Sequence, residues 1–323
     1  MKKLLVGIIS CAAVLGATSC HKVTVTPTKV VPLYTTLADF DSMDSLRRDS
    51  VMRTDSVAIR AFMQVLGCDS VTDSIVERWS QSRVVEAFTP EVRKVYPNVS
   101  EIENMISWLL QKAKVEQLDL PSRQYVAVVW GLQKSIVFND TTMLVALNHY
   151  LGRDFQGYQG LPEYLRMGKT PQRLPYDMAE AMVANRYPYE KNDSSTILSR
   201  MVYEGALTLA KIKMVPDGSL QGALGYTTEQ LQWLDENQGS LWNEMTNKKL
   251  IYSTSEDVMD KLMAPAPATT ILSPYSPGRV GRYIGYCIIV SYLEANAKTT
   301  IPQLLSPSFY NNPKILIESA YGG

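Results

Sequence analysis

Apolar residues recur at helical spacing through most of the chain. In the first third they predict one helix over residues 40–66 and a second over about 69–88, which Pro90 is expected to end. A third helix is predicted after Ser100, because Ser100 and Glu103 form a capping-box pattern in front of an apolar run. This part of the sequence therefore predicts packed helices.

β-branched and aromatic residues concentrate between residues 124 and 147, and they predict about three short strands, too few for a sandwich or a barrel. Helical spacing then resumes at about 176–186, 194–214, 227–237, 240–250, 256–263, 278–296 and 314–320. Thr227 and Gln230 form another capping-box pattern. No repeat and no linker divides this stretch. The pattern predicts one α+β domain over residues 34–323, predominantly α-helical with a small β-sheet.

The connection over residues 153–174 is longer than usual and rich in Gly, Pro and Tyr. Phe155, Tyr158 and Tyr164 offer amphipathic rings on it, and the flanking charges offer hydrogen bonds, a mixture that suits a sugar or a peptide. We expect these three rings to contact a ligand or partner. The same rings would also pin an ordered loop to the core, and the sequence leaves both roles open.

The N-terminus has the pattern of a lipoprotein signal peptide. Lys2 and Lys3 precede an apolar run over residues 4–16, and small residues then precede Cys20. The run is shorter than the ~20 residues that span a bilayer as a helix. We expect residues 1–19 to be removed and Cys20 to carry lipid, which would anchor the protein to a membrane.

Two other interpretations of this segment stay open. Residues 17–19 also fit an ordinary signal-peptidase site, in which case Cys20 is not lipidated. Alternatively, residues 8–11 resemble a lipobox, the short motif that ends in the lipidated cysteine, although the apolar run before Cys11 is shorter. Residues 20–33 contain two prolines and many Thr and Val, which predicts a lipidated cysteine followed by an extended tether. They carry no acidic cluster of the kind used for surface display. We therefore expect a cell-envelope protein that is lipid-anchored and faces the periplasm.

The balance of charged residues narrows the classes of partner that the protein is expected to bind. The chain has 32 basic and 32 acidic residues, and removing residues 1–19 leaves 30 against 32, which gives no support for nucleic acid as a partner. The expected partners are the membrane, through the lipid, and envelope proteins or cell-wall glycan. Of the remaining cysteines, Cys68 and Cys287 would pair in an oxidising compartment, although a free buried thiol is the simpler interpretation of Cys287 in its apolar helix.

Catalytic chemistry has few candidates. The two histidines are His21 and His149, so a His-Glu-x-x-His zinc site cannot form, and we predict neither a metal nor another cofactor. Glu204 lies at the flank of an apolar helix face, whereas Glu180 lies about opposite Met178 and is less well placed. Two carboxylates about 5–9 Å apart would permit glycosidase chemistry. His149 is more simply explained as a core histidine.

Small and aromatic residues mark one late helix. Gly281 and Gly285 lie one turn apart, which indicates close helix–helix packing inside the fold. The alternative, a transmembrane dimer face, is disfavoured because charged residues interrupt the stretch. Tyr283, Tyr286 and Tyr292 follow on the same helix and are expected to line the core or a groove.

Several blocks of this sequence resemble, in order and spacing, the gliding-motility lipoprotein family GldB of Bacteroidetes. The blocks are residues 146–155, 201–205, 225–233 and 276–285. The resemblance implies an envelope lipoprotein that gliding requires and that is tied to a secretion apparatus, although the family also occurs in species that do not glide. Asn148 stands where the family is expected to favour aspartate.

That family is distantly similar to a group of zinc proteases with His-Glu-x-x-His on one helix and Glu-Gly-x-Ala on the next. Residues 178–182 and 204–206 fall near those two motifs, and both metal-binding histidines are missing. The resemblance therefore implies a zincin-like fold without its metal.

Two functions follow as hypotheses. The first is a non-catalytic, membrane-anchored envelope lipoprotein that binds protein partners or cell-wall material in a gliding- or secretion-related assembly. The alternative is a periplasmic hydrolase, a degenerate zincin-like protease or a glycosidase, that uses Glu204 with a second carboxylate or with His149. Clustering of these groups around one pocket would favour the hydrolase, and separation by more than about 10 Å would exclude it.

Overall fold

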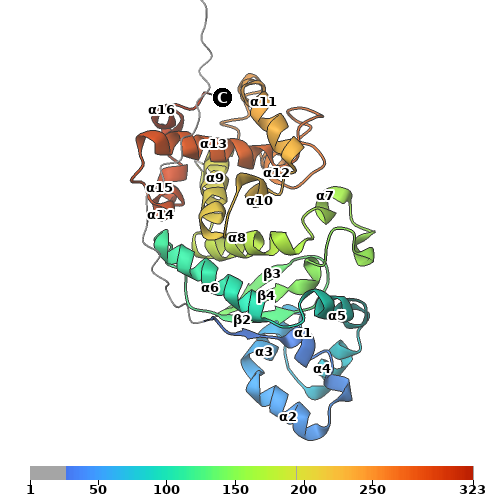
Figure 1. Ribbon diagram of the computed structural model, residues 1–323. Coiled ribbons are helices and arrows are strands. Elements are labelled where there is room, and N and C mark those ends of the chain that lie inside the picture. The colour runs from blue at the N-terminus through green and yellow to red at the C-terminus, as the bar shows by residue number, and fades with distance from the viewer. Residues whose placement is uncertain (1–26, 194, 323) are drawn as a thin grey trace, which may run out of the picture.

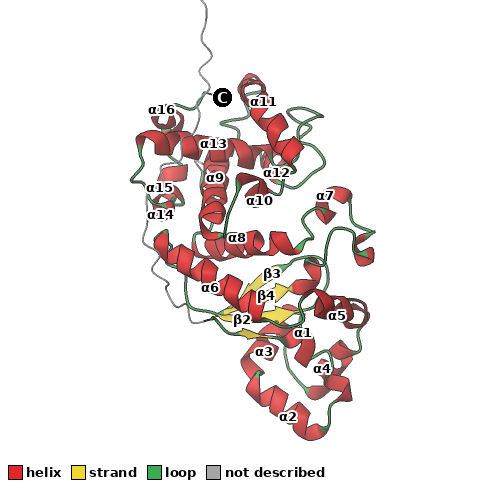
Figure 2. Cartoon of the chain, viewed as in Figure 1, coloured by secondary structure: helices red, strands yellow, loops and turns green. Residues whose placement is uncertain are grey.

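The computed structural model describes residues 27–193 and 195–322. The predicted signal peptide, Cys11 and Cys20 lie outside the described residues. Helices surround a four-stranded mixed sheet, which confirms the predicted helix-rich α+β class (Figures 1 and 2).

The sheet has the order β1-β2-β4-β3. Strands β1 (Val30–Val31), β2 (Gln124–Val128) and β4 (Thr142–Ala146) are parallel, and β3 (Ile136–Asn139) pairs antiparallel with β4 at one edge. Side chains alternate between the two faces of the sheet, as strand geometry requires. Tyr125 and Ala127 belong to one hydrophobic core, whereas Val126 and Val128 belong to the other.

The N-terminal strand corrects the predicted tether. Val30 and Val31 pair with β2, the backbone N–H of Thr28 donates to Ser107 Oγ at 2.6 Å, and that of Val30 donates to Glu103 Oε1 at 3.1 Å. The folded body therefore begins several residues before the predicted boundary at residue 34. Two residues are too few to display the period of two from which a strand is recognised.

The smaller core lies under the N-terminal helices α1 (Leu33–Thr36), η1 (Phe40–Ser42), α2 (Ser45–Thr54), α3 (Ser56–Val65) and α4 (Asp73–Ser80). The prediction of one helix over residues 40–66 is wrong. Asp44 interrupts it, because its side chain accepts a hydrogen bond from the Arg47 backbone N–H and caps the start of α2. A second break at Asp55 separates α2 from α3.

Helices α5 (Arg83–Val95) and α6 (Ser100–Val115) differ from prediction in detail. Pro90 lies inside α5 and does not end it. It is exposed, as is Glu86, whose carbonyl loses its usual N–H partner, so water can hydrate that carbonyl. The capping box at Ser100 is not formed, since the carboxylate of Glu103 accepts from β1 instead.

The larger core holds η2 (Leu147–His149), α8 (Leu174–Arg186), α9 (Ile197–Met214), α10 (Leu220–Leu224), α11 (Thr228–Asn247), α12 (Glu256–Met263), α13 (Val280–Ala295), α14 (Ile301–Leu304), α15 (Pro307–Tyr310) and α16 (Ile315–Ser319). The predicted capping box of Thr227 and Gln230 begins α11 and is confirmed. Within the 153–174 loop lie η3 (Gln156–Tyr158), α7 (Glu163–Arg166) and η4 (Pro171–Arg173).

Helices α9 and α13 cross in Figure 1, and glycines lie at their contact. A Cβ atom on Gly205 would meet the Gly285 carbonyl, and one on Gly285 would meet the Met201 carbonyl. This confirms the predicted close packing inside the fold, with Gly285 at the contact. Gly281 packs against Met263 of α12.

Two further observations concern the envelope predictions. Across residues 27–193 and 195–322, no helix has the length and apolar character needed to cross a membrane. Cys68 and Cys287 are free thiols, each associated with a different hydrophobic core, so the pairing considered for them is not formed.

Candidate functional site

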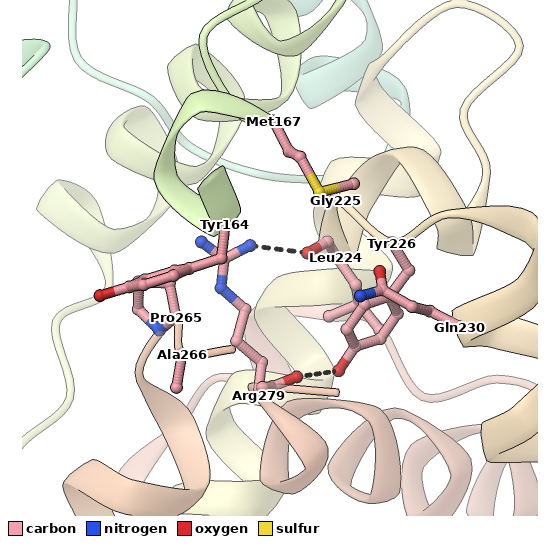
Figure 3. Close-up of a pocket in the computed structure, with 10 residues that line it drawn as sticks. Tyr164, Met167, Leu224, Gly225, Tyr226, Gln230, Pro265, Ala266 and Arg279 are labelled. Atoms are coloured by element: carbon pink, nitrogen blue, oxygen red, sulfur yellow. Dashed lines mark hydrogen bonds between the residues drawn. The ribbon is translucent and has the colours of Figure 1, made fainter. Parts of the chain in front are cut away.

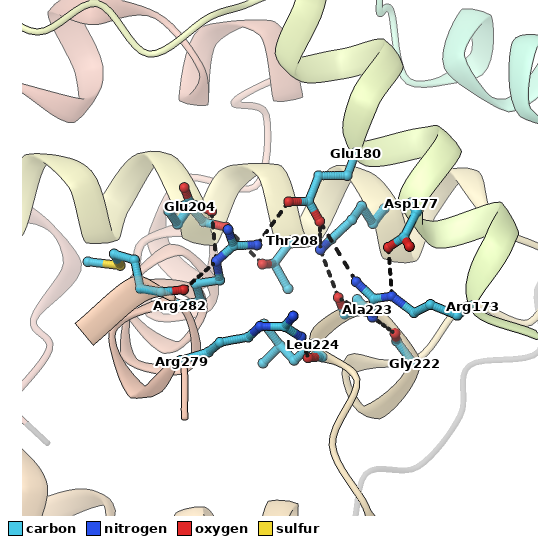
Figure 4. Close-up of polar contacts among 12 residues, drawn as sticks. Arg173, Asp177, Glu180, Glu204, Thr208, Gly222, Ala223, Leu224, Arg279 and Arg282 are labelled. Atoms are coloured by element: carbon cyan, nitrogen blue, oxygen red, sulfur yellow. Dashed lines mark hydrogen bonds and ion pairs between the residues drawn. The ribbon is translucent and has the colours of Figure 1, made fainter. Parts of the chain in front are cut away.

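Three helices turn charged side chains towards one another (Figure 4). Arg173, the residue before α8, and Asp177 and Glu180 of α8 follow one another at intervals of four and three, and Arg200, Glu204 and Lys211 share one face of α9. The start of α13 adds the last two members. We name the charge cluster by its eight residues: Arg173, Asp177, Glu180, Arg200, Glu204, Lys211, Arg279 and Arg282.

Glu180 lies at the centre of the charge cluster. Its Oε2 is 2.6 Å from Lys211 Nζ and 3.9 Å from Arg173 Nη2, and its Oε1 is 2.9 Å from Arg282 Nη1. Burial alone would raise the pKa of Glu180, but Lys211, Arg282 and Arg173 together hold it well below its usual value. Glu180 therefore stays ionised.

Lys211 is almost fully buried, with a side-chain exposure of 1%. Its Nζ donates to Glu180 Oε2 at 2.6 Å and to the carbonyl of Ala223 at 2.7 Å. Burial lowers the pKa of Lys211 to about 8, although the charge of Glu180 acts in the opposite direction. A lysine at this depth needs its carboxylate partner to remain charged.

Glu204 is buried between two arginines. Its Oε1 lies 2.5 Å from Arg200 Nη2, and its Oε2 lies 3.2 Å from Arg282 Nε, an ion-pair distance without hydrogen-bond alignment. Arg282 thus contacts Glu204 with Nε and Glu180 with Nη1. The structure does bring Glu204 together with a second carboxylate, but an arginine lies against both of them.

The sequence interpretation underrated Glu180, and it did not select the four cations that pair with these carboxylates, Arg173, Arg200, Lys211 and Arg282. The prediction that Glu180 is poorly placed is wrong, because its helix packs on α9 and its carboxylate reaches the cations there. A signal was present: apolar residues surround most of the circumference of α9, so a charge within that stretch is expected to be buried and to need a partner.

His149 belongs to a different environment. Its Nε2 lies 3.0 Å from the carbonyl oxygen of Gly131, and its Nδ1 lies 2.7 Å from Lys169 Nζ. Burial, and then the charge of Lys169, lower the pKa of His149 to about 4. A neutral ring therefore accepts from Lys169 and donates to Gly131. Its hydrogen bonds do not involve Glu204.

Arg279 differs from the other arginines of the charge cluster. Nη1 donates to the carbonyl of Leu224 at 2.7 Å, while Nε is buried and has no partner among the described residues. Its backbone is left-handed, with φ 64°. Gly225 approaches the guanidinium groups of both Arg173 and Arg279, and its own φ of 72° suits glycine.

The three loop aromatics have different surroundings. Tyr158 is fully buried, where its hydroxyl donates to the carbonyl of Asn148 and accepts from the backbone N–H of Leu151 at 3.2 Å. The ring of Phe155 lies 5.1 Å from that of Tyr158, between ring centroids. These contacts fit the pinning role for Tyr158 and Phe155.

Tyr164 is half-buried on α7 and lines a small pocket of about 40 Å³ (Figure 3). Arg279 and Tyr226 line the same pocket, in which the Tyr226 hydroxyl donates to the carbonyl of Gly278 at 2.7 Å. Of the three predicted contact residues, Tyr164 is the one that this pocket brings close to the charge cluster.

The carboxylates do not reproduce the zinc site of the distantly similar protease group. Across the described residues, no three His, Cys, Asp or Glu side chains gather in a way that could hold a metal ion. Met178 is fully buried in the apolar core, and Met182 is also buried there, while Glu204 is paired with arginines.

Comparison with known protein families gives one match. The family model described as gliding motility protein GldB matches residues 22–323, nearly the whole chain. Searches of curated proteins and of solved structures find no match. The match includes all eight residues of the charge cluster.

Proposed function

Because the chain belongs to the GldB family of gliding-motility proteins, we propose that it is an envelope lipoprotein, anchored by lipid at Cys20, that acts by binding and not by catalysis. The body faces the periplasm in this proposal. Its partners are envelope proteins or cell-wall material of a gliding- or secretion-related assembly.

The observation that carries the non-catalytic role is the pairing of the two central carboxylates. A general acid must hold a proton near neutral pH, and a general base must have an oxygen free to accept one. Glu180 is held ionised by three cations, and Glu204 lies between Arg200 and Arg282. Neither arrangement leaves an acid and a base in the roles that glycoside hydrolysis requires.

The second route to hydrolysis, Glu204 with His149, is also disfavoured. His149 is hydrogen-bonded at both ring nitrogens, to Gly131 and to Lys169, so no ring nitrogen is directed at a substrate. A buried histidine with a pKa near 4 is a poor general acid at neutral pH.

One experiment separates binding from hydrolysis. The full-length lipidated protein is purified from membranes and incubated with cell-wall sacculi and with denatured protein, and products are followed by mass spectrometry. We expect no turnover. Product that appears with the wild type and disappears with Glu204→Gln would establish the hydrolase instead.

Partner binding is tested in cells by a photo-crosslinking residue at position 164. Position 252 serves as the matched control, because Tyr252 is 63% exposed and does not line the pocket of Tyr164. We expect a specific adduct to an envelope protein or glycan from position 164 and none from position 252. Equal labelling at both positions would contradict a binding surface at Tyr164.

The lipid anchor has its own test. Cys20→Ala should move the protein from the membrane fraction to the soluble periplasmic fraction, whereas Cys68→Ala should leave it in the membrane fraction. An unchanged distribution of Cys20→Ala would contradict lipidation at Cys20.

A further inference from the structure

A cavity of about 390 Å³ opens beside the charge cluster. Its polar side is formed by Arg173, Asp177, Glu180, Arg279 and Arg282, and its other side by Ser135, Ile136, Ala181 and Ala184. The volume falls within the range of about 300–1,000 Å³ that is typical of small-molecule sites. The cavity lies between the outer strand of the sheet and α8, with the start of α13 across it.

The charges that line this cavity do not balance. Three arginines face two carboxylates, and the whole charge cluster has five cations against three carboxylates. Arg173 pairs with Asp177 at 2.7 Å, and Arg282 pairs with Glu180 and Glu204. Arg279 is the arginine of the cavity to which no carboxylate of the described chain is paired.

One edge of Arg279 is left without a partner. Nη1 donates to the carbonyl of Leu224, whereas Nε is enclosed by protein and has no partner. Nη2 makes no hydrogen bond within the described residues and is not enclosed. Nη2 is therefore the donor that Arg279 offers to a ligand on the side that Leu224 does not use.

The protein maintains this arrangement at a cost. Burial, together with the nearby charges of Arg173 and Arg282, lowers the pKa of Arg279 to about 10. The left-handed backbone is unfavourable for a residue with a Cβ atom. The neighbouring Gly278 is packed against the backbone of Ala266, which fixes the segment there. An unpaired buried cation on a strained backbone is typical of a binding site.

We propose that this cavity binds the free carboxylate of a ligand, with Arg279 donating to the carboxylate and the ligand body against Ile136, Ala181 and Ala184. A carboxylate is favoured over a phosphate because the charged residues that line the cavity have an excess of one positive charge, which a single carboxylate neutralises. This inference rests on the proposed binding function and names the chemistry of one ligand.

Calorimetry on the full-length protein in detergent, at pH 7 and constant ionic strength, tests the proposal. The probes are N-acetylated dialanine with a free C-terminal carboxylate, the same dipeptide with a C-terminal amide, and inorganic phosphate. We expect the free acid to bind at least tenfold more tightly than either of the others. Absence of binding by the free acid, or tighter binding of the amide or of phosphate, would overturn the proposal.

Two variants locate the site. Arg279→Gln should weaken binding of the free acid at least tenfold. Ala184→Trp fills the apolar side of the cavity and leaves every charged residue unchanged, so it should reduce binding at least tenfold. This variant tests the site independently if Arg279→Gln fails to fold. Arg153→Gln is the matched control, because Arg153 is exposed on the nearby loop, and its Kd should stay within twofold of the wild type.

These measurements distinguish failure of the carboxylate proposal from failure of the proposed binding function. If Ala184→Trp or a folded Arg279→Gln binds the free acid like the wild type, the cavity is not the site. If no probe binds while the crosslink from position 164 persists, the carboxylate proposal fails and the binding function stands. Detection of hydrolysis would instead contradict the binding function itself.

Discussion

The helices packed on the two faces of the sheet differ in where they place their ion pairs. On the N-terminal face the core is apolar, and the ion pairs lie at its rim, as with Arg48 and Glu77 at 3.1 Å. On the other face Lys211 and Glu180 meet in the middle of three packed helices. Figure 1 shows the two groups of helices on either side of the strands.

The two regions differ in how strictly their contacts fix the relative arrangement of the helices. Apolar packing on the N-terminal face needs shape and volume but little direction. A buried ion pair gains stability only in the correct geometry, so the pairs of the charge cluster hold α8, α9 and α13 in one relative arrangement. The same pairs hold Arg279 beside an open cavity.

The largest expected effect comes from breaking the centre of the charge cluster. Glu180→Gln leaves the buried Lys211 without its carboxylate partner and removes a partner of Arg282. The free energy of unfolding should therefore fall by about 3–5 kcal/mol in urea titrations. The matched change on the other face, Glu77→Gln, should cost about 1 kcal/mol or less. Equal losses would show that the two faces do not differ.

Helix packing gives the next effect. Gly285→Ala places a Cβ atom against the Met201 carbonyl, and we expect it to lower the free energy of unfolding by about 3 kcal/mol. Gly239→Ala at an exposed position of α11 meets nothing within 4 Å and should instead stabilise the protein by up to about 1 kcal/mol. A neutral Gly285→Ala would mean that α9 and α13 can separate.

Acid sensitivity is expected to trace to His149, the histidine of the described residues. Its folded pKa of about 4 lies below the ordinary 6.5, so the unfolded chain binds a proton first as the pH falls. Stability is therefore lost between about pH 6.5 and 4, by about 2 kcal/mol from pH 7 to pH 5. Glu180 contributes only at lower pH, because its pKa is already below the ordinary carboxyl value.

The measurement is the free energy of unfolding at pH 7 and pH 5 in urea. His149→Gln, which keeps an acceptor and a donor, should flatten the difference. A variant that loses as much stability as the wild type between these pH values would rule out His149 as the source.

The smallest effect separates two tyrosines of one loop. Tyr158→Phe removes a buried hydroxyl that donates to Asn148 and accepts from Leu151, so thermal unfolding should report a loss of about 1–2 kcal/mol. Tyr164→Phe should leave stability unchanged, because Tyr164 is half-buried beside a pocket. If Tyr164→Phe lost more stability than Tyr158→Phe, Tyr164 would be the ring that pins the loop and Tyr158 the ring that contacts a partner.

Part of the charge cluster is visible in the sequence once helix periodicity is applied to polar residues. Arg173, Asp177 and Glu180 form one stripe, and Arg200, Glu204 and Lys211 form another. Each stripe places its charges on one face of a helix, but neither shows that the face is buried or which helix supplies the counterion. Arg279 offers no such sign, because its importance lies in the partner it lacks.

Local rules of the chain determined much of this protein. The helix-rich α+β class, the cap at Thr227, the close packing at Gly285 and the family blocks all follow from patterns that extend over a few residues. Such patterns are reliable because hydrogen bonding and side-chain direction within one element depend on neighbours in sequence.

Tertiary structure decided the rest. The pairing of Val30 with β2, the burial of Lys211 against Glu180 and the unmatched charge of Arg279 depend on segments that are far apart in the chain. Coulomb energy and desolvation depend on distance and burial in space, which sequence spacing does not encode. The family and the fold class could thus be inferred from the sequence, whereas the candidate site required the assembled helices.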